Sequence, residues 1–276
     1  MTDVAVAIQG EAGSFSHAAA QEALGQHLQL IPCPTFDELF RAVETGEAAR
    51  GVVPIENSLA GSVYEAYDAL GAHALHVVGE TQVRVRHCLV VHPGTVFEDV
   101  RRVASHPVAL AQCRRLFVDH PTITPVPAYD TAGSVRDLLA GCLEADAAIG
   151  SALAAELYGG EILLEGIEDH PENYTRFLVV AREPGPTGGA TKTSLVFHLA
   201  NVPGSLYRAM GAFANRGLDL AKIESRPIMG RPWEYAFYLD VLGDPRGAVA
   251  DALAELASLA RELRVLGAYP ARAVPS

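Results

Sequence analysis

Short apolar runs alternate with helical patterns from residue 4 to residue 181, and this alternation restricts the fold more than any other feature of the sequence. Runs of this kind, bounded by turn residues, are typical of buried strands, and helix-capping residues open several of the segments between them. The alternation predicts βαβ units and a mostly parallel sheet, hence an α/β fold. The predicted strands are residues 4–8, 28–31, 52–55, 88–91, 100–104, 123–126, 147–149 and 175–181, and the predicted helices are residues 16–24, 35–45, 62–70, 109–118, 131–139 and 151–157.

A Pro/Gly-rich run, Glu-Pro-Gly-Pro-Thr-Gly-Gly at residues 183–189, interrupts this pattern. It has almost no side chain to bury and is typical of a linker. The patterns beyond it follow the order β-α-β-β-α-β, which is the ferredoxin-like arrangement of α+β domains. The chain of 276 residues is long enough for two ordinary domains, and we expect one at 1–182, a linker at 183–191 and the other at 192–270. The second domain has predicted strands at 194–199, 220–228, 234–241 and 263–269, and predicted helices at 205–216 and 248–260.

The composition argues against several classes of function. With 33 acidic and 21 basic residues, of which only Lys192 and Lys222 are lysines, the chain is a poor candidate for binding nucleic acid or an anionic membrane. No apolar stretch is long enough to span a membrane and the N-terminus lacks a signal-peptide pattern, so we expect a cytoplasmic protein. The four cysteines are then expected to be reduced. His73 and His76 have no ligand partner at helical spacing, and we expect neither a metal nor a cofactor.

The first candidate for chemistry is the run from Gly10 to Ser16, where a strand leads into a glycine-rich turn and a helix start. Free N–H groups at a helix start bind anions, and the hydroxyls of Ser14 and Ser16 can cap the helix or contact a ligand. The run lacks the third glycine of a dinucleotide loop and the lysine of a P-loop. Taken alone, it favours an ordinary turn between a strand and a helix.

A second group of polar residues follows the strand at 52–55 and contains Asn57, Ser58, Gly61 and Ser62. Ligands of open α/β sheets bind beyond the carboxyl ends of the strands, where this group is expected. Turn formation would also explain Asn57 and Ser58. The density of neutral hydrogen-bond donors nevertheless favours a small polar ligand.

Three further candidates lie at the ends of predicted elements. His106, within Ser-His-Pro, precedes a predicted helix and could act as an acid or base, although a surface histidine is the more frequent outcome. Thr131, within Asp-Thr-Ala, lies at another capped helix start. Thr175, Arg176 and Phe177 enter the last strand of the first domain, where a hydroxyl and a guanidinium could address a leaving group and a carboxylate. On residue types alone, a plain strand start is the favoured interpretation.

In their order and spacing, these runs resemble the motif set of prephenate dehydratases over about residues 4–181. The resemblance implies a catalytic module of two α/β lobes around a cleft, like a periplasmic binding protein, with Thr175 as the essential catalytic residue. Two residues differ from the pattern of this family. Glu11 stands where the family often has Pro, and Val108 stands where it often has Gln, and both differences change side-chain contacts at the expected rim of the cleft. The substrate-binding residues expected from the runs are Ser14, Ser16, Asn57, Ser58, Gly61, Ser62, His106, Thr131, Arg176 and Phe177.

Two runs of the second domain resemble the phenylalanine-binding motifs of the ACT regulatory domain found in this family. The resemblance implies feedback inhibition by L-phenylalanine at an interface between two such domains, in a homodimer or homotetramer. Glu224 could face the ammonium group of the effector, or it could simply pair with Arg226. Some relatives carry a chorismate mutase domain in front, which we do not expect here. The predicted effector-binding residues are Asn201, Val202, Pro203, Gly204, Ser205, Leu206, Glu224, Ser225, Arg226 and Pro227.

The implied reaction converts prephenate to phenylpyruvate with loss of carbon dioxide and water, and formation of the aromatic ring drives it. Departure of the ring hydroxyl needs a proton or a strong donor. Because threonine is a poor acid, we expect Thr175 to donate a hydrogen bond to the leaving hydroxyl or to relay a proton. A cation on the ring carboxylate would stabilise the charge that must leave and slow the reaction. Arg176, if it contacts the substrate, is therefore expected to bind the side-chain carboxylate.

Two other functions stay open. Arogenate dehydratase catalyses the same reaction on the amino analogue, and the motifs do not separate the two substrates. A non-catalytic amino-acid sensor would use the two lobes only for binding. The missing signal peptide and the retained Thr175-Arg176-Phe177 run both disfavour the sensor.

Overall fold

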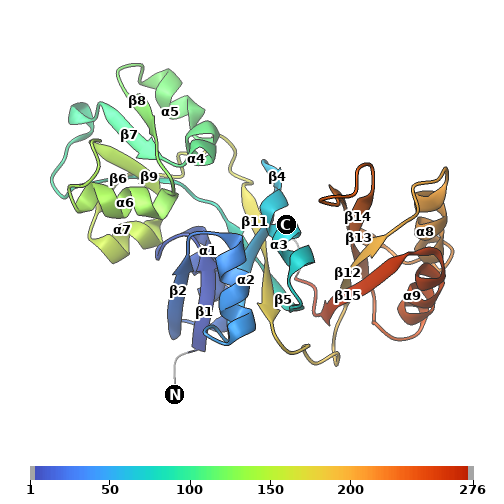
Figure 1. Ribbon diagram of the computed structural model, residues 1–276. Coiled ribbons are helices and arrows are strands. Elements are labelled where there is room, and N and C mark those ends of the chain that lie inside the picture. The colour runs from blue at the N-terminus through green and yellow to red at the C-terminus, as the bar shows by residue number, and fades with distance from the viewer. Residues whose placement is uncertain (1–3, 273–276) are drawn as a thin grey trace.

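Three β-sheets, each with its own helices, divide the chain into two lobes and a C-terminal domain (Figure 1). The computed structural model describes residues 4–272, so residues 1–3 of the predicted first domain lie outside the described part. Within this range, no helix has the length and apolar character needed to cross a membrane. The two lobes form the α/β module and the third sheet follows the predicted β-α-β-β-α-β order.

The first lobe is built on a sheet whose five main strands follow the order β2-β1-β3-β11-β5, with β4 attached to β3. The first three of these strands are parallel, whereas β11 runs antiparallel to both of its neighbours. The last strand of the α/β module therefore lies inside the sheet of the first lobe. The elements are β1 (Val4–Gln9), α1 (Phe15–Leu24), β2 (Leu28–Cys33), α2 (Phe36–Thr45), β3 (Arg50–Asn57), β4 (Gly61–Ser62), α3 (Tyr64–Ala72), β5 (His76–Arg84) and β11 (Tyr174–Ala181).

The second lobe has a five-stranded sheet of order β10-β6-β9-β7-β8. Its strands β7, β8 and β9 are parallel, and β6 runs antiparallel to β9 and β10. The elements are β6 (Cys88–Val91), the 3-10 turn η1 (Phe97–Asp99), β7 (Arg102–Ser105), α4 (Pro107–Gln112), α5 (Arg114–Asp119), β8 (Thr124–Pro127), α6 (Thr131–Leu139), β9 (Ala147–Gly150), α7 (Ala152–Tyr158) and β10 (Glu161–Glu165).

The prediction of a mostly parallel sheet is wrong, because the sheets of both lobes are mixed. The chain leaves the first lobe after β5 and returns to it as β11, and the returning strand runs against its neighbours. Strands β5 and β10, which flank these two crossings, were not predicted.

Two helices also differ from their predicted form. The helix predicted from residue 62 begins at Tyr64, because Gly61 and Ser62 pair with β3 as a short hairpin. Gly61 has a φ of 82°, in the left-handed region that glycine adopts readily. The helix predicted at 109–118 is divided into α4 and α5 at Cys113, and the Asp169 carboxylate accepts the N–H groups of the first two residues of α5.

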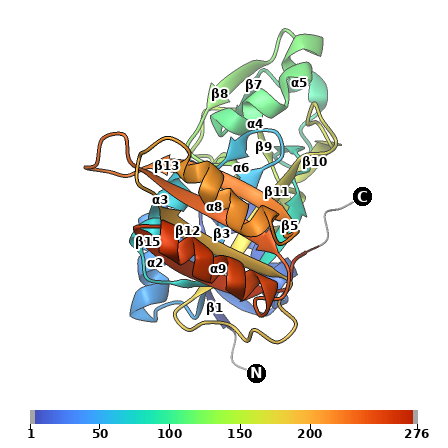
Figure 2. The same ribbon diagram turned by 90° about the vertical axis from the view of Figure 1, so that its right-hand side faces the viewer.

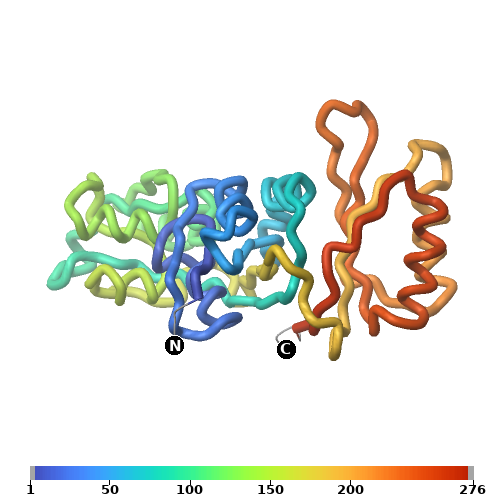
Figure 3. Tube along the Cα trace, turned by 60° about the horizontal axis from the view of Figure 1, so that its bottom comes forward, coloured from blue at the N-terminus to red at the C-terminus, as the bar shows by residue number. Residues whose placement is uncertain are grey.

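The C-terminal domain is a four-stranded antiparallel sheet of order β13-β14-β12-β15. Helices α8 and α9 lie side by side over one face of this sheet and form a core with it (Figure 2). The loop between β13 and β14 extends beyond the rest of the domain (Figure 3). The elements are β12 (Lys192–His198), α8 (Ser205–Ala214), β13 (Leu220–Pro227), β14 (Tyr235–Leu242), α9 (Ala248–Leu259) and β15 (Glu262–Tyr269).

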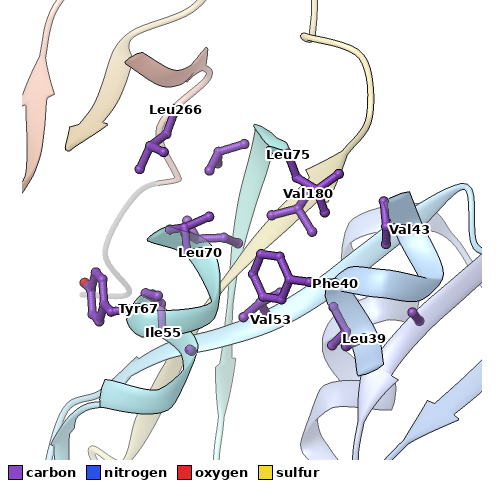
Figure 4. Packing of buried hydrophobic residues seen from close by; sticks show 14 of the residues in the cluster. Leu39, Phe40, Val43, Val53, Ile55, Tyr67, Leu70, Leu75, Val180 and Leu266 are labelled. Atoms are coloured by element: carbon purple, nitrogen blue, oxygen red, sulfur yellow. The ribbon is translucent and has the colours of Figure 1, made fainter. Parts of the chain in front are cut away.

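The other face of the C-terminal sheet packs against the first lobe. Tyr238 and Leu266 of this sheet belong to the same hydrophobic cluster as Tyr67, Leu70 and Leu75 of the first lobe (Figure 4). All five side chains are at least 95% buried. Because burial of apolar surface stabilises contacts between domains, the C-terminal domain is held by a shared core and not only by its linker.

Candidate active site

A cleft of about 540 Å³ lies between the two lobes and is lined by residues of both and of β11. The structure brings eight of the ten predicted substrate-binding residues to this cleft, together with Thr175. Residues from opposite ends of the α/β module therefore meet here, as expected for a two-lobed fold. The eight are Ser14, Ser16, Asn57, Gly61, Ser62, His106, Thr131 and Phe177.

Helices from both lobes begin at the cleft. Ser14 caps α1 by accepting the N–H of His17, and Asp130 caps α6 by accepting the N–H of Gly133 at 2.7 Å. In the same way, the Nδ1 atom of His106 accepts the N–H of Val108 at the start of α4. Helix N-termini carry partial positive charge. The cleft therefore offers weak positive potential from the backbone.

Thr175 lies on β11 between β3 and β5, opposite Asn57 on one side and Val83 on the other. Its side chain is buried, with 9% of the residue exposed, and its Oγ1 accepts a hydrogen bond from Asn57 Nδ2 at 2.9 Å. A hydroxyl that already accepts one bond keeps its own proton free to donate. This geometry suits the predicted role of a hydrogen-bond donor in the cleft.

The two lobes also touch at the rim of the cleft. Ser151 donates to the carbonyl of Gly13, and Tyr158 donates to the carbonyl of Ala12 at 2.9 Å. A Cβ on Gly13 would lie 2.8 Å from the backbone of Ala154, so this close approach requires glycine. Glu11, one of the two departures from the family pattern, forms an ion pair with Arg136 of the second lobe at 2.8 Å.

Several residues that line the cleft were missed by reasoning from the sequence. They are Glu65, His87, Gln112 and Asp130. Burial lowers the pKa of His87 and raises the pKa of Asp130. Asp130 and Gln112 lie in runs that resemble the family's motifs, but neither was predicted to bind substrate. Glu65 and His87 lie within or beside predicted elements, where no local pattern marks them as functional. Among the described residues that line the cleft, none is a lysine or an arginine.

Ser58 and Arg176 are the two predicted substrate-binding residues that the structure does not bring to the cleft. The Ser58 hydroxyl donates to the carbonyl of Glu172 and accepts the N–H of Tyr174. Ser58 thus fastens the segment that leads into β11. Arg176, which was expected to bind a substrate carboxylate, does not line the cleft.

Arg176 points to the junction between the first lobe and the C-terminal domain. Its guanidinium forms ion pairs with Glu80 at 2.7 Å and with Asp240 at 2.6 Å, and Glu80 also binds Lys192 at 2.6 Å. Burial alone would lower the pKa of Arg176, but the two carboxylates outweigh it and raise the pKa. The arginine therefore stays charged and already has two carboxylate partners. It contacts Tyr269 as well, through Nη2.

The two predicted effector-binding motifs lie apart from the cleft, in the C-terminal domain. The first forms the loop and first turn of α8, where Gly204 has a φ of 79°. The second forms part of β13. Glu224 does not pair with Arg226. Instead, it accepts a hydrogen bond from Ser62, and Arg226 binds Asp68 of α3 at 2.7 Å. Ser62 thus contacts both the cleft and an effector motif.

Across residues 4–272, no group of three or more His, Cys, Asp or Glu side chains could hold a metal ion. The cleft presents hydroxyls, side-chain amides, two histidines, helix starts and the carboxyl groups of Glu65 and Asp130. The hydroxyls, amides and helix starts can bind an anionic ligand through hydrogen bonds and can assist a leaving group that needs a donor.

Known proteins resemble this chain over nearly its whole length. The family model described as prephenate dehydratase matches residues 6–185. Arogenate dehydratase/prephenate dehydratase 2, chloroplastic, from Arabidopsis thaliana is 43% identical, covering 97% of this chain and 73% of that protein.

Two solved structures share the fold across all three parts. Prephenate dehydratase in complex with L-Phe from Arthrobacter aurescens is 35% identical with a TM-score of 0.90, covering 97% of this chain and 90% of that one. A structure described as GqqA, a novel type of quorum quenching acylases, is 38% identical with a TM-score of 0.89, covering 97% and 98%. The chain belongs to the prephenate dehydratase family.

Proposed function

We propose that this protein converts prephenate to phenylpyruvate by decarboxylating dehydration, as a step of L-phenylalanine biosynthesis in the cytoplasm. The observation that carries the proposal is the Thr175 hydroxyl, held in the cleft by Asn57 with its proton free to donate. Family membership supports an enzyme of the prephenate or arogenate dehydratase kind.

The reaction breaks two bonds on opposite sides of the ring. The C–C bond to the ring carboxylate breaks, carbon dioxide departs, and the electron pair enters the ring. The C–O bond to the hydroxyl breaks at the other end, and the departing oxygen leaves as water once it is protonated. Thr175 stabilises the charge that develops on this oxygen, and the proton comes from water or a neighbouring acid.

The lack of a lysine or arginine among the described lining residues suits this chemistry. A cation beside the ring carboxylate would stabilise the ground state more than the transition state, in which that charge is being lost. Hydrogen bonds from neutral groups hold the substrate without this penalty. Since Arg176 is held by Glu80 and Asp240, we assign a substrate carboxylate to the helix start at Ser14, whereas the carboxyl group of Asp130 already caps the helix start at Thr131.

Arogenate is the second candidate substrate, and one feature of the cleft favours it. Glu65 and Asp130 both line the cleft and could face the ammonium group that arogenate carries in place of the prephenate ketone. Several relatives have names that include arogenate dehydratase. One of them is a Petunia hybrida protein that is 41% identical over 96% of this chain. Initial rates on both substrates, measured with the same preparation, decide between them.

We propose further that L-phenylalanine inhibits the enzyme by binding to the C-terminal domain in a homodimer or homotetramer. The related Arthrobacter aurescens structure contains L-Phe. Large apolar side chains are exposed around the two effector motifs, which fits a subunit interface there. They are Val202, Leu206, Tyr207, Ile223, Met229 and Trp233. Calorimetry that detects no phenylalanine binding to the intact protein would refute this regulation.

Two other activities receive less support from the cleft. A sensor without catalysis would have no use for a buried hydroxyl whose proton is free. The acylase activity named for the GqqA structure would need an activated nucleophile. Of the three cleft serines, Ser14 caps a helix and Ser62 is bonded to Lys222 and Glu224, and among the described residues no histidine side chain is hydrogen-bonded to the hydroxyl of Ser14, Ser16 or Ser62.

The deciding experiment is ultraviolet detection of phenylpyruvate formed from prephenate by the purified protein. We expect turnover without added metal or cofactor, and the same turnover after treatment with a chelator. Binding of prephenate without product formation would favour the sensor instead.

A further inference from the structure

A chain of side-chain hydrogen bonds crosses from the first lobe to the second beside Thr175. Asn57 Nδ2 donates to Asn173 Oδ1 at 2.7 Å, and Asn173 Nδ2 donates to Gln112 Oε1 at 2.9 Å. His87 Nε2 lies 3.0 Å from the same Gln112 oxygen. The chain thus joins β3, the segment before β11, helix α4 and the residue before β6.

The direction of every bond in this chain follows from its first member. Asn57 Oδ1 accepts the backbone N–H groups of Leu59 at 3.0 Å and Ala60 at 2.9 Å. Backbone N–H groups can only donate, so the Asn57 amide has one orientation and its Nδ2 must face Asn173 and Thr175. Asn173 is fully buried, so its own amide must then accept with the oxygen and donate with the nitrogen.

The far end of the chain fixes the protonation state of His87. Gln112 Oε1 can only accept, so His87 must donate from Nε2. Its Nδ1 is buried and has no hydrogen-bond partner among the described residues. An imidazolium would bury a charge and a second N–H group without a partner, which is costly. The neutral tautomer with the proton on Nε2 is therefore favoured.

We propose that this chain presets the cleft for departure of the hydroxyl, with Asn173 as the positioning residue. Asn173 holds the amide of Asn57, and this amide donates a hydrogen bond to the Thr175 oxygen. The Thr175 hydroxyl therefore uses its own proton to donate. Asn173 also occupies the oxygen of Gln112, which leaves the amide NH2 of this cleft-lining residue to donate to the substrate. The inference rests on the proposed dehydratase function, because a departing hydroxide is the group that needs such donors.

The first test needs no turnover, so it can fail or succeed independently of the proposed function. In nitrogen-15 NMR of histidine-labelled wild-type protein, we expect His87 to be neutral with its proton on Nε2 at neutral pH. A His87→Phe variant assigns the signal. Observation of the Nδ1-protonated tautomer or of an imidazolium at His87 overturns the proposal.

The second test is the isosteric variant Asn173→Asp. The ionised carboxylate that this variant places at position 173 cannot donate to Gln112, so the Gln112 amide must turn over, present its oxygen to the cleft and move the His87 proton to Nδ1. A protonated carboxyl at position 173 can still donate and restores the original direction. The ratio of variant to wild-type kcat should therefore fall as the pH rises, by up to about 100-fold, with the His87 tautomer changing over the same pH range.

The matched control is Asp169→Asn, an exchange between the same two residue types on the same segment but outside the chain of hydrogen bonds. Asp169 accepts backbone N–H groups at the start of α5, which asparagine also does. The kcat of the Asp169→Asn variant relative to wild type should not depend on pH. A ratio for Asn173→Asp that is independent of pH, or an unchanged His87 tautomer, contradicts the proposal. If Asn173→Asp fails to fold, the wild-type tautomer still decides.

Discussion

Thr175 and Arg176 are neighbours on β11, yet they belong to two regions of opposite chemical character. Thr175 faces a cleft lined by hydroxyls, amides, helix starts and the carboxyl groups of Glu65 and Asp130, and among the described lining residues there is no lysine or arginine. Arg176 faces the junction with the C-terminal domain, where Glu80, Lys192 and Asp240 surround it with charge. Successive side chains of a strand point to opposite faces. One strand therefore lines the cleft on one face and joins the C-terminal domain on the other.

Adjacent residues of one sequence motif can thus belong to different regions of the molecule. Three adjacent residues form one motif in the sequence. In a strand, however, the first and third side chains lie on one face and the second lies on the other. Thr175 and Phe177 line the cleft, whereas Arg176 does not.

Removal of the hydroxyl on the cleft face should have the largest effect. Thr175→Ala is expected to lower kcat by about 100- to 1,000-fold with little change in the Kd for prephenate, because the lost hydrogen bond forms mainly in the transition state. Thr175→Ser keeps the hydroxyl and is the matched control, which should retain much of the activity. Steady-state kinetics measures kcat, and calorimetry measures the Kd for prephenate. Wild-type turnover by the alanine variant would refute the catalytic role proposed for Thr175.

On the opposite face, Arg176→Met should act on stability. Loss of one partner from a buried ion pair leaves uncompensated charge, at a cost of about 3–5 kcal/mol in the free energy of unfolding. The exposed pair of Arg231 and Glu234 offers the control, since Arg231→Met should cost about 1 kcal/mol or less. Denaturant titration measures both. If Arg176→Met is as stable as wild type but binds substrate less tightly, Arg176 is a substrate-binding residue and the prediction is wrong.

The contact between the cleft and the effector motif should influence regulation. Ser62→Ala removes the hydroxyl that binds both Lys222 and Glu224. We expect L-phenylalanine still to bind the intact protein in calorimetry, while the concentration needed for half-inhibition rises about fivefold or more, because the two sites lose part of their coupling.

The control for this variant is Asp244→Asn, an exposed residue of the C-terminal domain that pairs only locally with Arg246. It should leave the inhibition curve unchanged. Unaltered inhibition of Ser62→Ala would show that coupling between the two sites does not pass through this hydroxyl.

The junction should also make stability depend on pH. Burial alone would raise the pKa of Glu80, but Arg176 and Lys192 outweigh it and lower the pKa. A carboxyl whose pKa is lowered by folding stabilises the folded state above its ordinary pKa, near 4.5, and this contribution is lost as the pH falls through the folded value. Wild type should therefore melt at a higher temperature than Glu80→Gln at neutral pH. The gap should narrow below about pH 4.5, and thermal melting curves across this range would reveal a constant gap if the prediction is wrong.

The smallest effect is expected at the rim of the cleft. Glu65→Gln should lower the ratio of kcat/KM for arogenate to that for prephenate by about two- to fivefold, because an exposed carboxylate attracts an ammonium group only weakly. Glu38→Gln, an exposed position of α2 outside the cleft, should leave the ratio unchanged. An unchanged ratio in Glu65→Gln would remove this residue from substrate selection.

Much of the fold could be predicted because its signals are local. The helix starts at Ser14, Thr35, Asp130 and Ser151 follow from capping side chains that bond backbone N–H groups within the same turn. The β-α-β-β-α-β order of the C-terminal domain follows in the same way from apolar spacing. The mixed sheets could not be predicted, since strand direction depends on how the chain crosses between the lobes.

The candidate site was predictable in part. Residues at strand ends and helix starts reach the cleft because these ends face each other in a two-lobed α/β module. His87 could not be found, and Gln112 was not singled out within its motif run, since the significance of both comes from hydrogen bonds to residues distant in the sequence. The strand period alone would have warned that Arg176 and Thr175 cannot face the same cleft.

The sequence by itself determined the order of the elements, the division at the Pro/Gly linker and the motif that contains Thr175. Only the tertiary structure decided which face of β11 meets the cleft, and it joined Asn57 to Asn173 across 116 positions of the chain. Capping and periodicity act over a few residues, so they can be recognised in a linear sequence. The direction of a buried hydrogen bond depends on every partner around it, and these partners come together only when the lobes pack.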